Sequence, residues 1–484
     1  MKACIKNLFS RLGGASCAAW VLPALIAGLG LISAGRVTAQ TFTPLHTFTG
    51  SDGTGPQAGL ILSGNTLYGV ASSGGSSGRG TVFAMNIDGS GFTNLHSFSP
   101  ITDGANPSGN LILSGNTLYG TATNGGNFLY GTVFKVNTDG SGFTKLHSFT
   151  GSYVSSPPGD GARPKAGLVL SSNTLYGVAS GGGSIGYGTV FKLNTNGTGF
   201  MVLHDFIGSD GDLPIGGLVL SGNTLYGTAY DGFSSAASSN GTVFAINTDG
   251  TGFTNLHYFT GGGHSSSGFT NTGGAYPKGG LIIFGDTLFG TTSSGGAGSG
   301  TVFALKTNGT SFTILHTFSA NPLGTNEDGA NPAGTLILSG TALYGAANLG
   351  GTLGQGTVFS LRTNGTFFTT LHSFSYSSDG THPAELILAG NNIYGTASAG
   401  GSFGYGTIIS LSLPPPPQLT IIRSAENVIV RWPTNAVGFN LQTTTNLVPP
   451  AVWITNSPAP VVVNGQNAVT NPVSGTKKFY RLSQ

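Results

Sequence analysis

The stretch LYGTATNGGNFLYGTVFKVNTDGSGFTKLHSF, residues 118–149, decides the fold because the chain repeats it with small changes. Its markers Leu-Tyr-Gly, Gly-Thr-Val-Phe and Leu-His-x-Phe each occur seven times when close variants are included. The histidines of the third marker are His46, His96, His147, His204, His257, His316 and His372. Their spacing of 50–59 residues is typical of repeat architectures, in which each repeat is one supersecondary unit.

Each repeat is expected to form four short antiparallel strands. In the second unit these strands are residues 110–114, 117–123, 131–137 and 143–150, and Gly-rich turns separate them. Gly supplies the positive φ that a tight hairpin turn needs, and no segment has helical periodicity. Four-stranded units of this length predict the blades of a β-propeller. A β-solenoid is the alternative, although its repeats are usually shorter.

The two ends of the repeat array predict a closed ring. A strand of the fourth type, residues 42–48, precedes the first complete unit, and the seventh unit ends near Leu413 without its fourth strand. If the N-terminal strand completes the seventh unit, no strand edge stays open to aggregation. We therefore predict an all-β fold, with a seven-bladed β-propeller over residues 40–413 closed by the N-terminal strand.

A second module is expected after the array. Residues 414–417 are four prolines, a stiff linker, and residues 418–484 contain much less Gly and are net basic. Candidate strands at 419–423, 428–432, 438–444, 452–456, 461–464 and 477–482 predict a small β-sandwich. It is loosely like a fibronectin type III module with Trp432 as the core aromatic residue, but it is short for that fold, so a strand is expected to be missing.

Residues 1–39 have the features of a secretory signal peptide. Lys2, Lys6 and Arg11 form a basic region, residues 18–32 are apolar, and Val-Thr-Ala at 37–39 is a small-residue cleavage site. The apolar stretch is too short for a stable membrane span. The sequence therefore predicts a secreted or cell-surface protein without a transmembrane segment after cleavage, and a retained N-terminal anchor is the alternative.

Removal of this leader changes the charge and the cysteine content. Both cysteines, Cys4 and Cys17, lie in it, so the mature chain has no disulfide and no thiolate ligand. Four of the 18 basic residues and none of the acidic ones leave with it, which leaves 14 basic against 16 acidic residues. A nucleic-acid partner requires a basic face, which this composition lacks. We expect a monomer.

The repeat resembles the GloVer tandem-repeat family of bacterial exported proteins. The resemblance covers residues 42–412 and rests on the recurring order Leu-Tyr-Gly-Thr, Gly-Gly, Tyr-Gly-Thr-Val-Phe, Asn-Thr-Asp-Gly-Ser-Gly-Phe and Leu-His-Ser-Phe. It implies an exported surface or matrix protein with a signal peptide and a C-terminal attachment module, and it carries over no catalytic residues. The ending Lys478–Leu482 looks like the C-terminal modules of exported Verrucomicrobia proteins, but it has no terminal hydrophobic helix and no sortase-like motif.

The seven histidines are predicted to be structural. His147 has the same parity as Phe143 and Phe149, so strand alternation places the three side chains on one face. Blades pack face to face, and that face is expected to be buried, with the imidazole hydrogen-bonded to a neighbouring strand or loop. Histidines on seven outermost strands lie too far apart to converge on one metal ion.

Asp-Gly-x-x-Pro recurs between the fourth strand of one unit and the first strand of the next. Its aspartates are Asp52, Asp103, Asp160, Asp210, Asp328 and Asp379, while the fifth copy begins with Gly273. Asp-Gly is an ordinary turn pair in which the carboxylate caps its own backbone. The alternative is a carboxylate ring that binds Ca²⁺ or a polyhydroxy ligand. No other cofactor or metal site is predicted.

Positions at which the units differ are better candidates for ligand contact, because a ligand site needs asymmetry. The residue before Gly-Thr-Val-Phe varies, and the chosen ligand-face candidates are Arg79, Tyr130, Tyr187, Asn240, Gln355 and Tyr405. The tyrosines could stack on sugars or pack locally. Insertions at 151–159, 230–240, 261–274 and 319–327 are expected on the same face.

These features favour a non-catalytic binding or structural protein that presents a propeller face to a glycan, matrix or protein partner. The alternative is a secreted hydrolase or lyase that acts on a polysaccharide, with a pocket built around Tyr230, His264 and Glu327. No P-loop, nucleophile elbow or zinc motif is present. Residues 40–417 contain no Trp, which argues against several known propeller families.

Overall fold

The structure is a computed structural model and describes most of the chain after the predicted leader. The described residues are 40–99, 102–151, 159–234, 237–260, 264–265, 268–269, 272–319, 326–414, 418–433, 439–448, 451–456, 458–473 and 477–483. The predicted signal peptide and most of the linker and insertion residues lie outside them. Every regular element in the described residues is a β-strand, which confirms the all-β prediction. Among them, no helical segment has the length and hydropathy of a membrane span.

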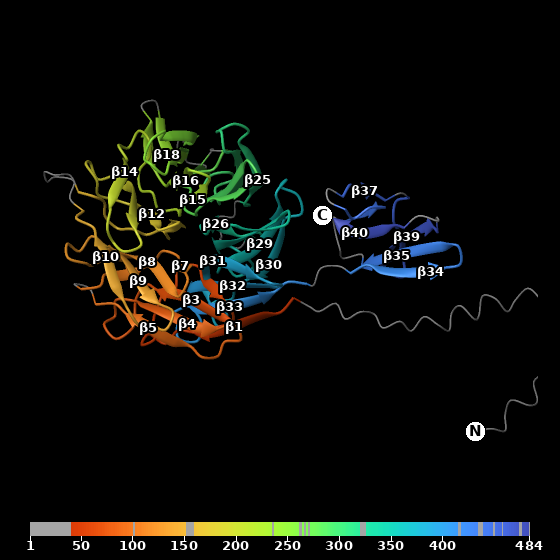
Figure 1. Ribbon diagram of the computed structural model, residues 1–484, viewed down its shortest axis with the longest axis horizontal. Coiled ribbons are helices and arrows are strands. Elements are labelled where there is room, and N and C mark those ends of the chain that lie inside the picture. The colour runs from red at the N-terminus through yellow and green to blue at the C-terminus, as the bar shows by residue number, and fades with distance from the viewer. Residues whose placement is uncertain are drawn as a thin grey trace, which may run out of the picture. The chain divides into compact units, whose positions relative to one another are not determined.

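Seven sheets of the array share one strand order, and each is here called a blade (Figure 1). Blade 1 is β2 (Ile61–Ser63), β3 (Thr66–Ala71), β4 (Thr81–Asn86) and β5 (Thr93–Ser97). Blade 2 is β7 (Ile112–Ser114), β8 (Thr117–Asn124), β9 (Thr132–Asn137) and β10 (Thr144–Ser148), with β6 (Ala105–Pro107) added on β8. Blade 3 is β11 (Val169–Ser171), β12 (Thr174–Ala179), β13 (Thr189–Asn194) and β14 (Met201–Asp205).

The remaining blades repeat this order. Blade 4 is β15 (Val219–Ser221), β16 (Thr224–Ala229), β18 (Ala237–Asn247) and β19 (Thr254–Thr260), with β17 (Gly232–Ser234) added on β18. Blade 5 is β22 (Ile282–Phe284), β23 (Thr287–Thr292), β24 (Thr301–Lys306) and β25 (Thr313–Thr317). Blade 6 is β27 (Ile337–Ser339), β28 (Ala342–Leu349), β29 (Thr357–Arg362) and β30 (Thr369–Ser373), with β26 (Ala330–Pro332) added on β28. Blade 7 is β31 (Thr381–Ala389), β32 (Asn392–Ala399), β33 (Thr407–Ser412) and β1 (Phe42–Thr47).

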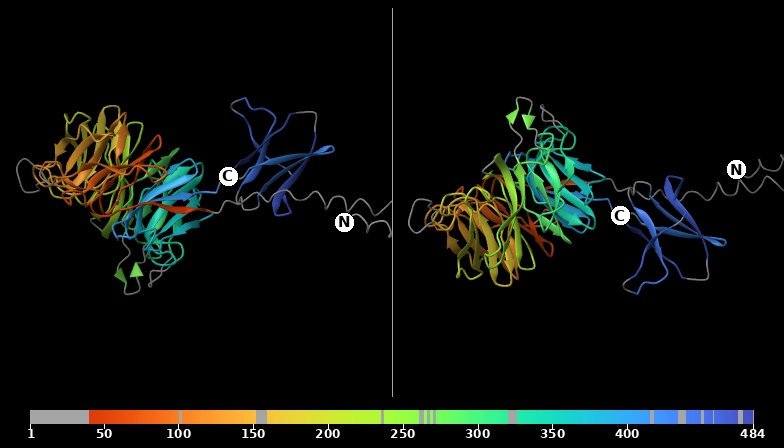
Figure 2. Two further views of the ribbon diagram at one scale, coloured as in Figure 1. Left: turned by 90° about the horizontal axis from the view of Figure 1, so that it is seen from below. Right: turned by 90° about the horizontal axis from the view of Figure 1, so that it is seen from above.

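The N-terminal strand completes the last blade, as predicted. β1 pairs antiparallel with β33, from Phe42 opposite Leu411 to Thr47 opposite Thr407. The blades lie around a common centre in Figure 1, with β1 beside β33. A short ribbon of β20 (His264–Ser265) and β21 (Gly268–Phe269) stands out from the sheets in Figure 2. The strand pairing joins the two ends of the array and argues against a β-solenoid.

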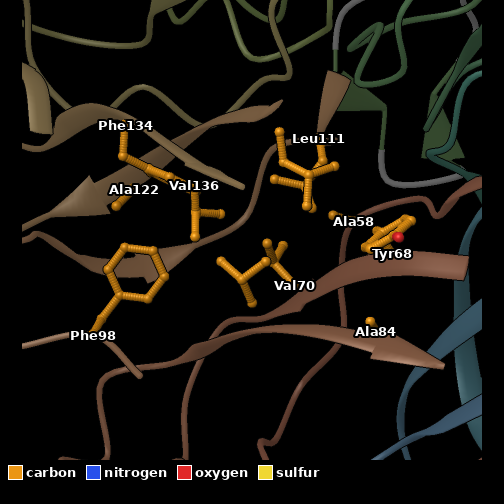
Figure 3. Close-up of a cluster of buried hydrophobic side chains, with 11 residues drawn as sticks. Ala58, Tyr68, Val70, Ala84, Phe98, Leu111, Ala122, Phe134 and Val136 are labelled. Carbon is orange, nitrogen blue, oxygen red and sulfur yellow. The ribbon is translucent and has the colours of Figure 1, made fainter. Parts of the chain in front are cut away.

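A hydrophobic cluster fills the space between each pair of neighbouring blades. Between blades 1 and 2 it contains Tyr68, Val70, Phe98, Leu111 and Phe134, all buried (Figure 3). Similar clusters join blades 2 and 3, 3 and 4, 4 and 5, 5 and 6, and 6 and 7. A further cluster joins blade 7 to blade 1. The core is therefore continuous around the ring, and burial of aromatic and branched side chains provides most of its stabilisation.

Each histidine of the Leu-His-x-Phe marker stacks on a phenylalanine of the next blade. The ring centroids are 3.6–3.9 Å apart in the pairs His46–Phe92, His96–Phe143, His147–Phe200, His204–Phe253, His257–Phe312, His316–Phe368 and His372–Phe42. The last pair crosses from blade 6 to β1 and repeats the geometry of the others. The predicted structural role of the histidines is confirmed.

Phe149 lies on the predicted face of the strand with His147, and Phe143 does not. The imidazole lies edge-on to Phe149, as predicted. Phe143 is on the opposite face of β10 and stacks on His96 of the preceding blade. The reason is a β-bulge between Lys145 and His147, where one extra residue reverses the alternation of side chains.

Each predicted aspartate is hydrogen-bonded to the histidine of its own repeat. The Nε2–Oδ2 distances are 2.8–3.2 Å in the pairs His46–Asp52, His96–Asp103, His147–Asp160, His204–Asp210, His316–Asp328 and His372–Asp379. The carboxylates also accept backbone N–H groups, for example that of Thr150 at 2.8 Å on Asp160. The hydrogen bonds from His147 and Thr150 lower the pKa of Asp160, although burial acts to raise it.

The fifth repeat lacks this pair, since Gly273 stands where the other repeats have Asp. His257 keeps its stacking contact with Phe312 at 3.8 Å. Burial lowers the pKa of His257 to about 4, and no carboxylate offsets it. This imidazole is therefore neutral at pH 7.

The module after the array has two sheets. The first contains β34 (Thr420–Ser424), β35 (Asn427–Pro433), β39 (Gln466–Pro472) and β38 (Val461–Val463). The second contains β37 (Ile454–Thr455), β36 (Asn440–Thr444) and β40 (Phe479–Ser483). Trp432 packs with Val430, Leu441 and Val469 from both sheets and is 1% exposed, so it is the predicted core aromatic. The sequence predicted no strand at β39.

Candidate functional site

One cavity of about 790 Å³ is lined by residues of all seven blades and therefore lies on the ring axis. Its walls are mainly the residues that follow the proline of each Asp-Gly-x-x-Pro motif and lead into the first strand. Each of these segments is joined to the preceding blade, because a threonine of that blade's second strand donates a hydrogen bond to a carbonyl group of the segment. Examples are Thr121 to the Ala166 carbonyl and Thr396 of blade 7 to the Ala58 carbonyl of blade 1, both at 2.9 Å.

Three polar side chains from distant repeats form a hydrogen-bonded network at this axis. Asn110 of blade 2 donates through Nδ2 to Oε2 of Glu385 of blade 7 at 2.5 Å. Thr335 of blade 6 donates through Oγ1 to Oε1 of the same carboxyl group at 3.2 Å. The backbone N–H groups of Gly59 and Gly280 donate to Asn110 and Thr335 at 2.7 and 3.1 Å, so five of the seven blades take part.

The other four blades have glycine at the same position, immediately before the first-strand Leu: Gly59, Gly167, Gly217 and Gly280. At Gly59 an added Cβ would lie 3.1 Å from Cβ of Glu385, and at Gly167 it would lie 2.9 Å from the carbonyl of Asn110. These glycines therefore make room for their polar neighbours. Gly217 is different, because an added Cβ there would meet no atom within 4 Å.

Two lysines also line the cavity. Lys165 of blade 3 and Lys278 of blade 5 both follow the motif proline directly, where other blades have Gln57, Ser108 and Ile215. Lys278 is exposed to the cavity, but the protein atoms around it desolvate its ammonium group and lower its pKa, and repulsion from Lys165 lowers it further. Burial raises the pKa of Glu385, against the hydrogen bonds of Asn110 and Thr335. The cavity thus has an amino half and a carboxyl half.

The ligand-face candidates predicted from the sequence do not line this cavity. Each instead uses its carbonyl to accept an N–H from the residue before the next motif proline, at 2.6–3.1 Å. The pairs are Arg79–Asn106, Tyr130–Arg163, Tyr187–Leu213, Asn240–Tyr276, Gln355–His382 and Tyr405–Gly55. They form a ring of inter-blade backbone contacts.

Their side chains have different surroundings. The ring of Tyr130 lies against Gly151 and that of Tyr405 against Gly50, although both tyrosines remain more than 40% exposed. Tyr187 packs on the core between blades 3 and 4, and Asn240 is buried. Arg79 is exposed, and Gln355 accepts a hydrogen bond from Thr381 at 2.8 Å. The candidates are thus spread around the ring.

The six aspartates of the alternative carboxylate ring are each hydrogen-bonded to the histidine of their own repeat. Among the described residues, no three His, Cys, Asp or Glu side chains gather closely enough to hold a metal ion. The alternative pocket at Tyr230, His264 and Glu327 does not coincide with the axial cavity, because Tyr230 and Glu327 are not among its lining residues. The side chain of His264 lies outside the described part of the chain, as do most residues of the insertions.

Sequence reasoning missed Asn110, Lys165, Lys278, Thr335 and Glu385. They do carry a sequence signal, because they are variable positions between an invariant proline and an invariant leucine. The seventh copy is also one residue shorter here, with two residues between Pro383 and Leu386 where the others have three.

A model of the Gloeobacter/Verrucomicrobia repeat matches residues 27–160, 155–268 and 264–435. The chain belongs to this repeat family. This match confirms the family resemblance that the repeat motifs of this chain indicated. No curated protein sequence matches the chain.

Several solved structures are similar to this Gloeobacter/Verrucomicrobia repeat protein in fold. The extracellular domain of the putative one-component system BT4673 from B. thetaiotaomicron is 11% identical with a TM-score of 0.50, over 87% of this chain and 48% of that chain. An oligogalacturonate lyase in complex with manganese is 11% identical with a TM-score of 0.48, over 78% and 97%. A nidogen/laminin complex is 14% identical with a TM-score of 0.37, over 61% and 91%. At this identity the likeness concerns the fold alone.

Proposed function

We propose that the protein is an exported, non-catalytic binding protein that holds a glycan of the cell surface or extracellular matrix in its axial cavity. The observation that carries the proposal is the asymmetry of the axis. Seven nearly identical repeats place Asn110, Thr335 and Glu385 there from three blades, and glycines of other blades leave space around them.

The chemistry of the lining suits a saccharide. Amide and hydroxyl groups of Gln57, Ser108, Asn110 and Thr335 can pair with sugar hydroxyls. Leucines that precede the first strands, such as Leu111, provide apolar contact for C–H faces. Ligand pockets commonly combine apolar walls with a few placed polar groups. A volume of about 790 Å³ is in the range of such pockets.

The lining favours binding over glycoside hydrolysis. Hydrolysis generally uses two carboxyl groups that flank the scissile bond. Among the described residues that line the cavity, Glu385 carries the single carboxyl group, and both of its oxygens already accept hydrogen bonds. A hydrolase or lyase is therefore the second candidate. An assay for reducing ends and unsaturated products on the same polysaccharides separates it from binding.

Filling the cavity is expected to abolish binding. Gly217→Phe introduces an aromatic ring where the axis is open, and the Cβ meets no neighbour. Affinity is measured by titration calorimetry on a panel of dextran, xylan, carboxymethyl-dextran, dextran sulfate and polygalacturonate. For any polysaccharide that binds the wild type, we expect the affinity to fall by about 100-fold or more, which is about 2.7 kcal/mol.

The matched control is Thr93→Phe, which adds the same ring at an exposed position of β5 on the outside of blade 1. It should bind like the wild type. Equal affinities of the Gly217→Phe variant and the wild type, at an unchanged melting temperature, would overturn the proposed site.

A further inference from the structure

The two axial lysines occupy one repeat position and are separated by a single blade. Lys165 and Lys278 each follow the motif proline, in blades 3 and 5, and both line the cavity. Only 7% of the residues in this chain are charged. Two ammonium groups that face one cavity in such a chain repel each other. The pKa of Lys278 is lowered first by desolvation among the surrounding protein atoms and then by this repulsion.

Nothing in the described residues neutralises this pair of charges. The lysine–carboxylate ion pair of the described chain joins Lys306 to Asp286 in blade 5, not either axial lysine. Glu385 is the nearest candidate within the cavity, but its carboxyl group is held by Asn110 and Thr335.

The space between the lysines is open. Blade 4 separates them and presents Ile215, Gly216 and Gly217 to the cavity. These residues carry no charge, and the direction in which a Gly217 side chain would extend is empty to 4 Å. A group of a few atoms can therefore lie against blade 4 with an ammonium group on either side.

We propose that Lys165 and Lys278 bind the anionic group, a carboxylate or a sulfate, of an acidic saccharide that enters the axial cavity. This inference rests on the proposed glycan-binding function and names the class of glycan. Charge-assisted hydrogen bonds from lysine to an oxyanion are about twice as strong as neutral ones. The hydroxyl groups of the same sugar form hydrogen bonds with the amide and hydroxyl groups on the Asn110 side. The two halves of the cavity therefore bind different parts of one ligand.

The test uses three polymers with one backbone: dextran, carboxymethyl-dextran and dextran sulfate. The purified chain should bind at least one of the two anionic polymers and not bind dextran. The double variant Lys165→Gln/Lys278→Gln should bind that polymer at least about tenfold more weakly, since tenfold corresponds to about 1.4 kcal/mol. The two anionic arms distinguish carboxylate from sulfate.

The matched control is Lys145→Gln on β10, which removes the same charge from a partly exposed side chain outside the cavity, whose Nζ donates to Asn127 at 2.6 Å. This variant should bind like the wild type. Equal binding of the lysine double variant and the wild type, or equal binding of dextran and its anionic derivatives, would overturn the anionic class.

The binding data distinguish a loss of anionic specificity from the absence of an axial binding site. If Gly217→Phe abolishes binding of a neutral polysaccharide and the lysine variants do not alter it, the axial site stands and its anionic specificity does not. If no polymer of the larger panel binds at all, both fail.

Discussion

A chain that begins at Thr49, and so lacks β1 and Phe48, is expected to be much less stable than one that begins at Gln40. The deletion exposes the edge of β33, to which β1 is paired over five residues. It also removes the stack of Phe42 on His372 at 3.7 Å and that of His46 on Phe92 at 3.9 Å. Phe48, which is 0% exposed, leaves its place against Phe83.

The expected loss exceeds that of an ordinary edge strand because two blade interfaces open at once. Full burial of a large apolar side chain contributes about 1.5–3 kcal/mol. Loss of the buried Phe48 and of the partly buried Phe42 and Leu45, which pack on the clusters of two blade interfaces, therefore costs roughly 5 kcal/mol. That is comparable to the whole stability of many domains, about 5–15 kcal/mol. The unfolding entropy is about 2.1 cal/mol/K per residue, so for a ring of this size we expect the melting temperature, followed by circular dichroism or calorimetry, to fall by roughly 6 °C or more.

Two further measurements isolate the strand itself. Phe42→Ala keeps the backbone pairing and loses one stacking contact, so its melting temperature should lie between the two chains. A synthetic peptide of residues 40–50 added to the truncated chain should restore part of the loss by pairing with β33. An unchanged melting temperature after truncation would show that β1 does not close the ring.

Asp379→Ala is expected to have the largest effect of a single substitution outside the hydrophobic core. Asp379 is 5% exposed and accepts hydrogen bonds from His372, at 3.0 Å, and from the backbone N–H and hydroxyl group of Ser375. Truncation leaves these partly buried donors without their acceptor. Such unpaired groups cost about 1–3 kcal/mol each, and we expect the free energy of unfolding, from urea titration, to fall by roughly 2–4 kcal/mol.

The dependence on pH distinguishes this role from simple packing. The hydrogen bonds of His372 and Ser375 lower the pKa of Asp379, although burial acts to raise it. A carboxyl group whose pKa is lower in the folded state stabilises it above the unfolded pKa, and this contribution is lost as the pH falls through the folded pKa. The difference between wild type and variant should therefore be largest at pH 7 and shrink towards pH 3. Asp139→Ala, in an exposed turn, should change stability far less at any pH, and a constant difference for Asp379→Ala would contradict the account.

The sequence was sufficient to predict the strands and the way the ring closes. In the second unit the observed strands Thr117–Asn124 and Thr132–Asn137 differ from the predicted ones by one residue. The reason is that the same apolar alternation and the same turn residues recur in every copy. Repetition also made the displaced first strand visible, because six complete units show what the seventh lacks.

Two local features were not predictable from alternation. The bulge before His147 inserts one residue into β10 and moves Phe143 to the other face, and no side chain in Phe-Thr-Lys-Leu-His marks it. β39 reads Gln466–Pro472, with amide side chains and a terminal proline that are unfavourable in strands, and it forms by pairing with β35 along seven residues. Tertiary contacts override propensity in both places.

The candidate site was missed because it depends on contacts across the whole ring. Asn110 and Glu385 are 275 residues apart in the sequence, and each belongs to a segment that looks like an ordinary connection. The predicted ligand contacts were the variable residues before Gly-Thr-Val-Phe. The carbonyl groups of these residues instead form hydrogen bonds that join neighbouring blades. The variation at the axis is confined to the two or three residues between the motif proline and the following leucine of each repeat, but the closed ring brings these residues together.

The central claim is that ligand binds at the axis and not on the loops around it, and hydrogen exchange measured by mass spectrometry tests it most directly. With saturating carboxymethyl-dextran or dextran sulfate, whichever binds, we predict slowed exchange in the axial segments 57–62, 108–112, 165–169, 215–219 and 278–282. Slowed exchange confined to the loops around Tyr130 and Tyr405, with the axial segments unchanged, would contradict the account.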